Sequence, residues 1–141
     1  DRVTADVVAE RRPTLEYLPM NAPEADQQIV SGIYQLEQGS TWRWMSQRAV
    51  VLLKSPAVAA PLKVALYIPD ASPARRVTVQ LEGREAASRT FPGPGTYTLE
   101  TPAETAGAPT ATVTITIDRV FSVPGDAREL GIILTGVGFQ K

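Results

Sequence analysis

Residues 112–118 read Thr-Val-Thr-Ile-Thr-Ile-Asp, and in this stretch apolar and polar side chains alternate with a period of two. This is the period of a β-strand that buries one face, and both Thr and Val favour strands. Residues 62–68 and 77–82 repeat the alternation. No long stretch has the period of an amphipathic helix, so the sequence predicts an all-β protein.

Two further stretches, 49–53 and 130–134, are apolar on both faces, which is typical of central strands that are covered on both sides. Glycines at positions 131, 136 and 138 indicate a bulge or a close backbone approach in the last strand. Glu82-Gly83 predicts a hairpin turn. Since several short strands are separated by turns, we expect an antiparallel β-sandwich, jelly-roll-like, with about eight strands.

The length of 141 residues suits one domain. We expect residues 31–141 to form the sandwich and residues 1–30 to form an N-terminal segment with an edge strand at 3–9 and a loop. The chain starts at Asp1 without a Met, so we expect it to be a processed product or a piece of a larger protein.

Composition excludes several classes of function. A net charge of −1 disfavours nucleic-acid binding. The absence of Cys and His removes disulfides, thiolate chemistry and the commonest acid–base residue and metal ligand. Four acids (Glu37, Asp118, Asp126 and Glu129) have no spacing that singles out a glycosidase pair. We therefore predict no catalytic residue, no metal site and no cofactor, with a structural calcium ion in a loop as an alternative.

Both tryptophans lie in the stretch Trp42-Arg43-Trp44-Met45. On a strand they share a face, and Arg43 points the other way. If that face is exposed, the indoles and Tyr34 form a platform on which sugar rings stack, with Arg43 nearby as a polar contact. If it is buried, the same residues are core, which is the commoner fate of large aromatic side chains and the interpretation that we favour.

A second stretch, 124–131, places three charges directly before a predicted buried strand. It is interpreted either as a ligand site at a strand end or as a structural joint. In the structural interpretation, which we favour, Arg128 pairs with Glu37 or Asp126, and Glu129 belongs to the same charged group.

Three motifs together resemble a known family. They are Gly-x-Tyr-x-x-Glu at Gly32, Tyr34 and Glu37, then Trp-Arg-Trp-Met at 42–45, and Asp-x-Arg-Glu-Leu-Gly at 126–131. Together they resemble the soluble, carbohydrate-binding-module-like β-sandwich at the C-terminus of bacterial polytopic membrane glycosyltransferases of the mannosyl- or arabinosyltransferase type. The resemblance covers about residues 30–140 and leaves residues 1–30 unexplained.

This resemblance implies an extracytoplasmic domain whose partners are a glycan and the membrane-embedded remainder of its protein, where catalysis would reside. The function expected is that of a non-catalytic, carbohydrate-binding accessory domain. A structural or protein-interaction domain without sugar binding is the alternative, since the motifs could mark the family because they hold the fold.

Overall fold

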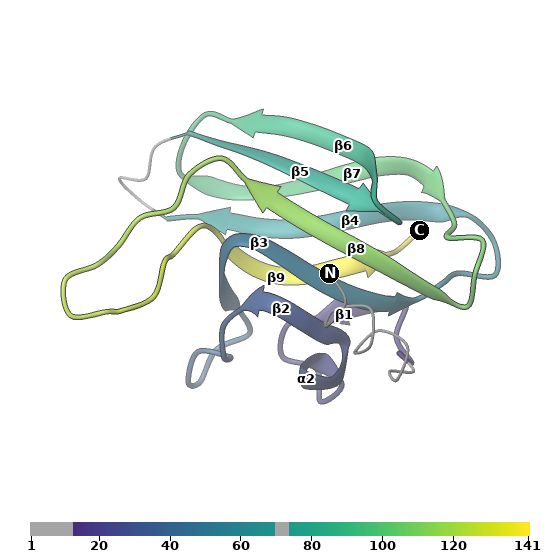
Figure 1. Cartoon of the computed structure of the whole chain (residues 1–141), viewed down its shortest axis with the longest axis horizontal. Helices are drawn as coiled ribbons and strands as arrows, with labels where there is room; N and C mark the ends of the chain where they lie inside the picture. Colours follow the sequence, from purple (N-terminus) through teal and green to yellow (C-terminus); the bar gives the residue numbers. More distant parts are fainter. Residues whose placement is uncertain (1–12, 70–73) are drawn as a thin grey trace.

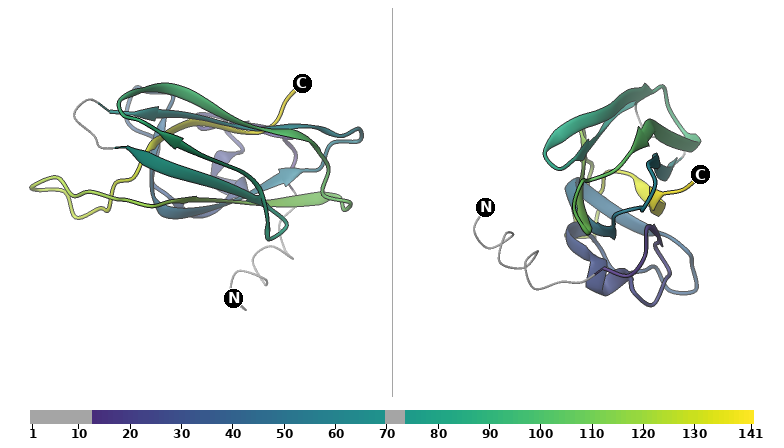
Figure 2. Two further views of the ribbon diagram at one scale, coloured as in Figure 1. Left: turned by 90° about the horizontal axis from the view of Figure 1, so that it is seen from above. Right: turned by 90° about the vertical axis from the view of Figure 1, so that its right-hand side faces the viewer.

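The computed structural model describes residues 13–69 and 74–141, which form two packed antiparallel sheets (Figures 1 and 2). The predicted all-β sandwich is confirmed, with nine strands where about eight were expected. One short helix, α2, accompanies them within the described residues. The elements are β1 (Tyr17–Pro19), α2 (Ala25–Gln28), β2 (Ile29–Ile33), β3 (Arg43–Lys54), β4 (Ala60–Ile68), β5 (Arg75–Leu81), β6 (Arg84–Phe91), β7 (Gly95–Glu104), β8 (Thr110–Ile117) and β9 (Ile133–Phe139).

The strands pair in two sheets that share β3. Sheet A has the order β1-β9-β4-β7, and sheet B has the order β2-β3-β8-β5-β6. The first residues of β3, Arg43 and Trp44, pair with β9, whereas residues 48–54 pair with β8. Because β3 passes from one sheet to the other, its first residues lie where the two layers meet, at the end from which the 118–132 loop projects (Figure 1).

The alternation seen in the sequence positions the core between the sheets. On β4, β5 and β8 the apolar residues point inward and are buried, while Tyr67, Thr78 and Thr116 lie on the outer faces. The predicted turn at Glu82-Gly83 is confirmed, since both residues have a positive φ (53° and 80°), as the tight turn between β5 and β6 requires.

The two predicted central strands have different outcomes. All of residues 49–53 in β3 are buried, as expected. The other stretch, 130–134, is buried too, but β9 begins only at Ile133. The strand starts late because Leu130 pairs instead with Phe121 across the loop, in an isolated bridge.

The predicted close approach is confirmed at glycines 131, 136 and 138, of which the last two lie in β9. β1 runs beside β9, with Tyr17 opposite Gly138 and Pro19 opposite Gly136. A Cβ atom at position 136 would collide with the ring of Tyr17, and one at position 138 would collide with the backbone of Glu16. Only glycine lets β1 and its tyrosine lie this close to β9.

Residues 13–30 pack against the sandwich rather than apart from it. Leu18 belongs to the buried core, and the amide of Gln28, 1% exposed, bonds to both Leu15 and the carbonyl of Leu52 at 2.9 Å. The edge strand expected at 3–9 lies outside the described residues, and the boundary at residue 30 stays a prediction. Across the described ranges, no helix has the length and apolar character that crossing a membrane requires.

Candidate functional site

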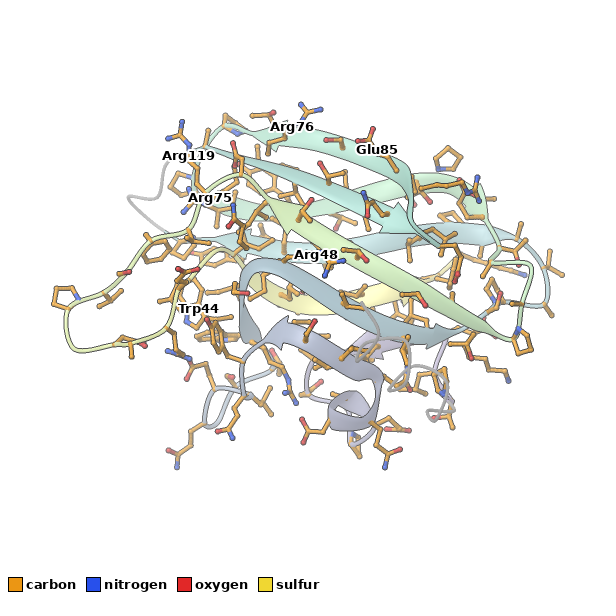
Figure 3. All side chains as sticks on the ribbon, viewed as in Figure 1. Trp44, Arg48, Arg75, Arg76, Glu85 and Arg119 are labelled. Carbon is orange, nitrogen blue, oxygen red and sulfur yellow. The ribbon has the colours of Figure 1, made fainter. Side chains whose placement is uncertain are left out.

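The two tryptophans lie at the end of the sandwich where β3 begins. Their indole rings meet edge to face with centroids 6.2 Å apart, and Trp44 meets Phe121 in the same way at 5.6 Å. Figure 3 shows Trp44 at this end, apart from Glu85 on β6. Both indoles are half-buried and neither belongs to the buried core, so the core interpretation favoured from the sequence is wrong.

Trp42 borders a hollow on the outer face of sheet A, which we call the Trp42 groove. Its volume is about 290 Å³. The strands set its walls, because Tyr67 on β4 lies opposite Ile133 on β9 and Thr96 on β7. The lining residues are Trp42, Leu66, Tyr67, Thr96, Ile133 and Thr135.

Small side chains follow the groove along the same outer face. Two positions before Tyr67, Ala65 lies opposite Gly136, over which the ring of Tyr17 packs. Two positions further, Lys63 pairs with Glu100 at 3.6 Å. Since a strand rises about 3.3 Å per residue, the strip from residue 67 to residue 63 is about 13 Å long.

The chemistry of this groove is that of a stacking surface. An indole and a phenol supply apolar faces, and two threonine hydroxyls can donate and accept hydrogen bonds. No lining residue is a carboxylate, an amine or a guanidinium. Within residues 13–69 and 74–141, no three His, Cys, Asp or Glu side chains gather as metal ligands. The groove can bind an uncharged solute, and it offers no group for general acid–base catalysis near pH 7.

Arg43 points away from the tryptophans, as the alternation predicts. Its side chain is 8% exposed, and its Nε donates to the carbonyl oxygen of Met20 at 2.8 Å. Its Nη1 donates to the Tyr34 carbonyl at 3.4 Å and to Asp26 at 3.2 Å. Arg43 therefore belongs to a different surface from Trp42 and Trp44, and its predicted contact with the same ligand has no support in this geometry.

Arg128 connects loop 34–42 with its own loop, 118–132. Both partners expected from the sequence, Glu37 and Asp126, contact it. Its Nη2 lies 2.7 Å from Oδ2 of Asp126, and its Nη1 lies 3.5 Å from Glu37. The hydrogen bonds from Arg128 lower the pKa of Asp126 to about 2. The guanidinium also lies 5.3 Å from the ring centroid of Tyr34. These contacts connect loop 34–42 with loop 118–132.

Two other predicted residues take part in the same joint in different ways. The hydroxyl of Tyr34 donates to the backbone carbonyl of Glu129 at 2.9 Å, so the tyrosine ties the loops together and is not part of the groove. The side chain of Glu129 is exposed, and none of the ion pairs among the described residues includes it.

The sequence analysis missed Tyr67 and Phe121 as members of this region. Tyr67 was visible on the polar face of the 62–68 alternation, where an aromatic ring is unusual. Phe121 gave no signal, because its contact with Trp44 depends on how the 118–132 loop folds back.

Comparisons with known proteins bear on the fold. No protein-family model matches the chain, and no curated protein matches it. Among solved structures, it is similar to the module CsCBM6-3 from Clostridium stercorarium in complex with cellobiose, with a TM-score of 0.51, 10% identity, and coverage of 93% of this chain and 97% of that chain. The chain has the fold of a carbohydrate-binding module.

Two enzymes contain a similar region. An acetyl xylan esterase from the rumen bacterium Butyrivibrio proteoclasticus matches with a TM-score of 0.55 and 13% identity, over 89% of this chain and 32% of the esterase. A cycloisomaltooligosaccharide glucanotransferase from Paenibacillus sp. matches with a TM-score of 0.51 and 10% identity, over 92% of this chain and 19% of the enzyme. The chain thus spans a third or less of each enzyme.

Proposed function

We propose that this chain is a non-catalytic carbohydrate-binding domain that holds a neutral glycan in the Trp42 groove. The observation that carries the proposal is the groove itself, an apolar hollow with an indole and a phenol at its walls and hydroxyls among them. Sugar rings have apolar C–H faces and a polar rim, so they stack on aromatic rings and bond to hydroxyls at the edge.

The strip beyond the groove favours a chain of sugars over a single one. Beyond Tyr67 the outer face carries the small side chain of Ala65, and the ring of Tyr17 covers Gly136 beside it. A strip about 13 Å long exceeds one sugar ring, and its axis follows β4. The rings of Tyr67 and Tyr17, which lie along this strip, give an extended oligosaccharide two surfaces to stack on.

The groove lining has no carboxylate, amine or guanidinium, which supports binding without turnover. Glycoside hydrolysis needs two carboxylates on either side of the scissile bond. The Glu100 carboxylate on the same face is paired with Lys63. We propose that catalysis belongs to another part of a larger protein.

For that larger protein we propose a membrane glycosyltransferase, with this domain on the extracytoplasmic side. The support is the resemblance of the motifs 32–37, 42–45 and 126–131, and the presence of a similar region within two much longer enzymes. Sequencing the gene around this chain tests the assignment, and hydrophobic spans in the same reading frame would support it.

Calorimetric titration with short linear oligosaccharides of mannose, arabinose, xylose and glucose tests the sugar binding. We expect at least one series to bind more tightly as the chain lengthens, and the Tyr67→Ala variant to weaken that binding. Tyr34→Phe is the matched control, since it removes one hydroxyl outside the groove. Affinity that is equal in both variants, or absent for every series, would contradict the proposal.

A structural or protein-interaction role is the second candidate. It is favoured by the contacts of Gly32, Arg43 and Arg128, because these motif residues hold backbone and loops together. On this account, changes at the groove alter folding or assembly with the parent protein and leave every sugar titration silent.

A further inference from the structure

A second hollow lies on the other side of the first residues of β3 and is separate from the Trp42 groove. It has a volume of about 530 Å³ and is bounded by residues 21–23, by Asp26 and by loop residues Gln35 and Leu36. Its polar lining differs from that of the groove. The side chains that matter below are Asn21, Asp26, Gln35 and Arg43, and we call the hollow the Arg43 cleft.

Arg43 gives this cleft a fixed hydrogen-bond donor. Two backbone carbonyls, those of Met20 and Tyr34, hold its Nε and Nη1, and the side chain is only 8% exposed. A guanidinium held in this way cannot turn aside. Its Nη2 makes no hydrogen bond to any residue in the described part of the chain, so that nitrogen can donate to a solute in the cleft.

Asp26 gives the cleft a matching acceptor. One oxygen, Oδ1, lies 3.2 Å from Nη1 of Arg43, while the side chain is 86% exposed. The second carboxylate oxygen has no partner among residues 13–69 and 74–141, and solvent reaches it. Because solvent reaches the Asp26 carboxylate, its attraction to the buried Arg43 is screened, and we expect the sandwich to fold without it.

We propose that the Arg43 cleft binds the vicinal diol of a neutral sugar. One hydroxyl accepts from Nη2 of Arg43, and its neighbour donates to Asp26. The amides of Asn21 and Gln35 each offer a donor and an acceptor to the remaining hydroxyls. Leu36, 37% exposed, lies against an apolar face of the ring.

The charges of the cleft select against ionic ligands. A carboxylate placed at Nη2 would lie beside the carboxylate of Asp26, and an ammonium group placed at Asp26 would lie beside the guanidinium of Arg43. A hydroxyl pair satisfies both groups without bringing a like charge close. The inference goes beyond the groove, because the two hollows share no lining residue and either can bind without the other.

NMR titration of the whole chain with methyl α-D-mannopyranoside tests the proposal, since its hydroxyls on carbons 2 and 3 form a vicinal diol. We expect the side-chain signals of Asn21, Gln35 and Arg43 to shift. Replacing Asp26 with Ala should weaken this binding about tenfold, as expected for the loss of a hydrogen bond to a charged group. The matched control is Glu24→Ala, which removes the same charge from the same segment outside the cleft.

Four further outcomes support or contradict the proposal. The cleft shifts should persist in a Trp42→Ala variant, and they should vanish for the sugar methylated on both diol oxygens. Shifts confined to the surroundings of Trp42 would contradict sugar binding in the Arg43 cleft and would leave the proposal for the Trp42 groove intact. Glucuronate binding that strengthens on Asp26→Ala would overturn the diol in favour of a carboxylate ligand.

Discussion

The indole rings of Trp42 and Trp44 meet edge to face at 6.2 Å, yet only Trp42 lines the groove. Trp44 lies behind it and contacts Phe121 from the 118–132 loop. The two indoles therefore have different roles. Trp44 fixes the orientation of Trp42 and the position of the loop, and Trp42 presents its ring to the solvent side of sheet A.

The Trp44–Phe121 contact should contribute to the stability of the fold. In a double-mutant cycle of Trp44→Ala and Phe121→Ala, we expect a coupling energy of about 0.5–1.5 kcal/mol, as for other edge-to-face pairs. Urea unfolding of the four proteins measures it. Strictly additive effects would show that the contact between these two rings stabilises nothing.

Gly136 should tolerate a methyl group only when Tyr17 is shortened. Gly136→Ala places a Cβ against the Tyr17 ring, so we expect a loss of about 1–3 kcal/mol of stability from overpacking. In a Tyr17→Ala background the same substitution should cost much less. Gly93→Ala is the control, since a Cβ there meets nothing within 4 Å. An equal cost in both backgrounds would refute the close approach of β1.

Substitution of Gln28 should lower the stability of the fold much more than is usual for a polar residue. The buried amide of Gln28 accepts from the Leu15 N–H and donates to the Leu52 carbonyl, so Gln28→Leu removes these hydrogen bonds, at a cost of about 1–3 kcal/mol for a group left without a partner. Thermal or urea unfolding measures the change. Gln47→Leu, at an exposed position of β3, provides the comparison and should be nearly neutral. A variant at residue 28 as stable as that control would contradict the bonding described.

Acid should loosen the joint between the two loops. The pKa of Asp126 is lowered from 3.8 to about 2, chiefly by hydrogen bonds from Arg128. A carboxyl with a depressed folded-state pKa stabilises the fold fully above its unfolded value, and this contribution is lost as the pH falls through the folded one. We therefore expect the amides of loop 118–132 to lose hydrogen-exchange protection between about pH 4 and pH 2. An Asp126 carboxyl that titrates in NMR at its ordinary value would refute the pair.

Sequence periodicity predicted much of the sheets, because the alternating stretches 62–68, 77–82 and 112–118 each have a buried face and an outer face. Residues 62–68 are the clearest case, and the 82–83 turn follows from its glycine. The late start of β9 was not predictable. An apolar residue such as Leu130 suits both a strand and a loop bridge, and its partner, Phe121, lies across the loop. Local pattern carries no information on such a pairing.

The candidate site was predicted only in part. The strand period correctly placed Arg43 on the opposite side from its neighbouring tryptophans. It could not predict the exposure of the two indoles, because an indole on a strand suits a core and a surface equally. The groove depends on cross-strand neighbours. Tyr67, Thr96 and Ile133 meet only because β7, β4 and β9 pair in one register, which long-range packing determines.

Fluorescence of a Trp44→Phe variant tests the central claim most directly, because Trp42 is then the only indole in the chain. The variant is titrated with the oligosaccharide that binds best by calorimetry. The account predicts a blue shift and reduced acrylamide quenching as sugar covers the ring, and Trp42→Ala should weaken binding about tenfold or more, equivalent to the loss of about 1.5–3 kcal/mol of aromatic burial. Binding with unchanged Trp42 emission and quenching would contradict it.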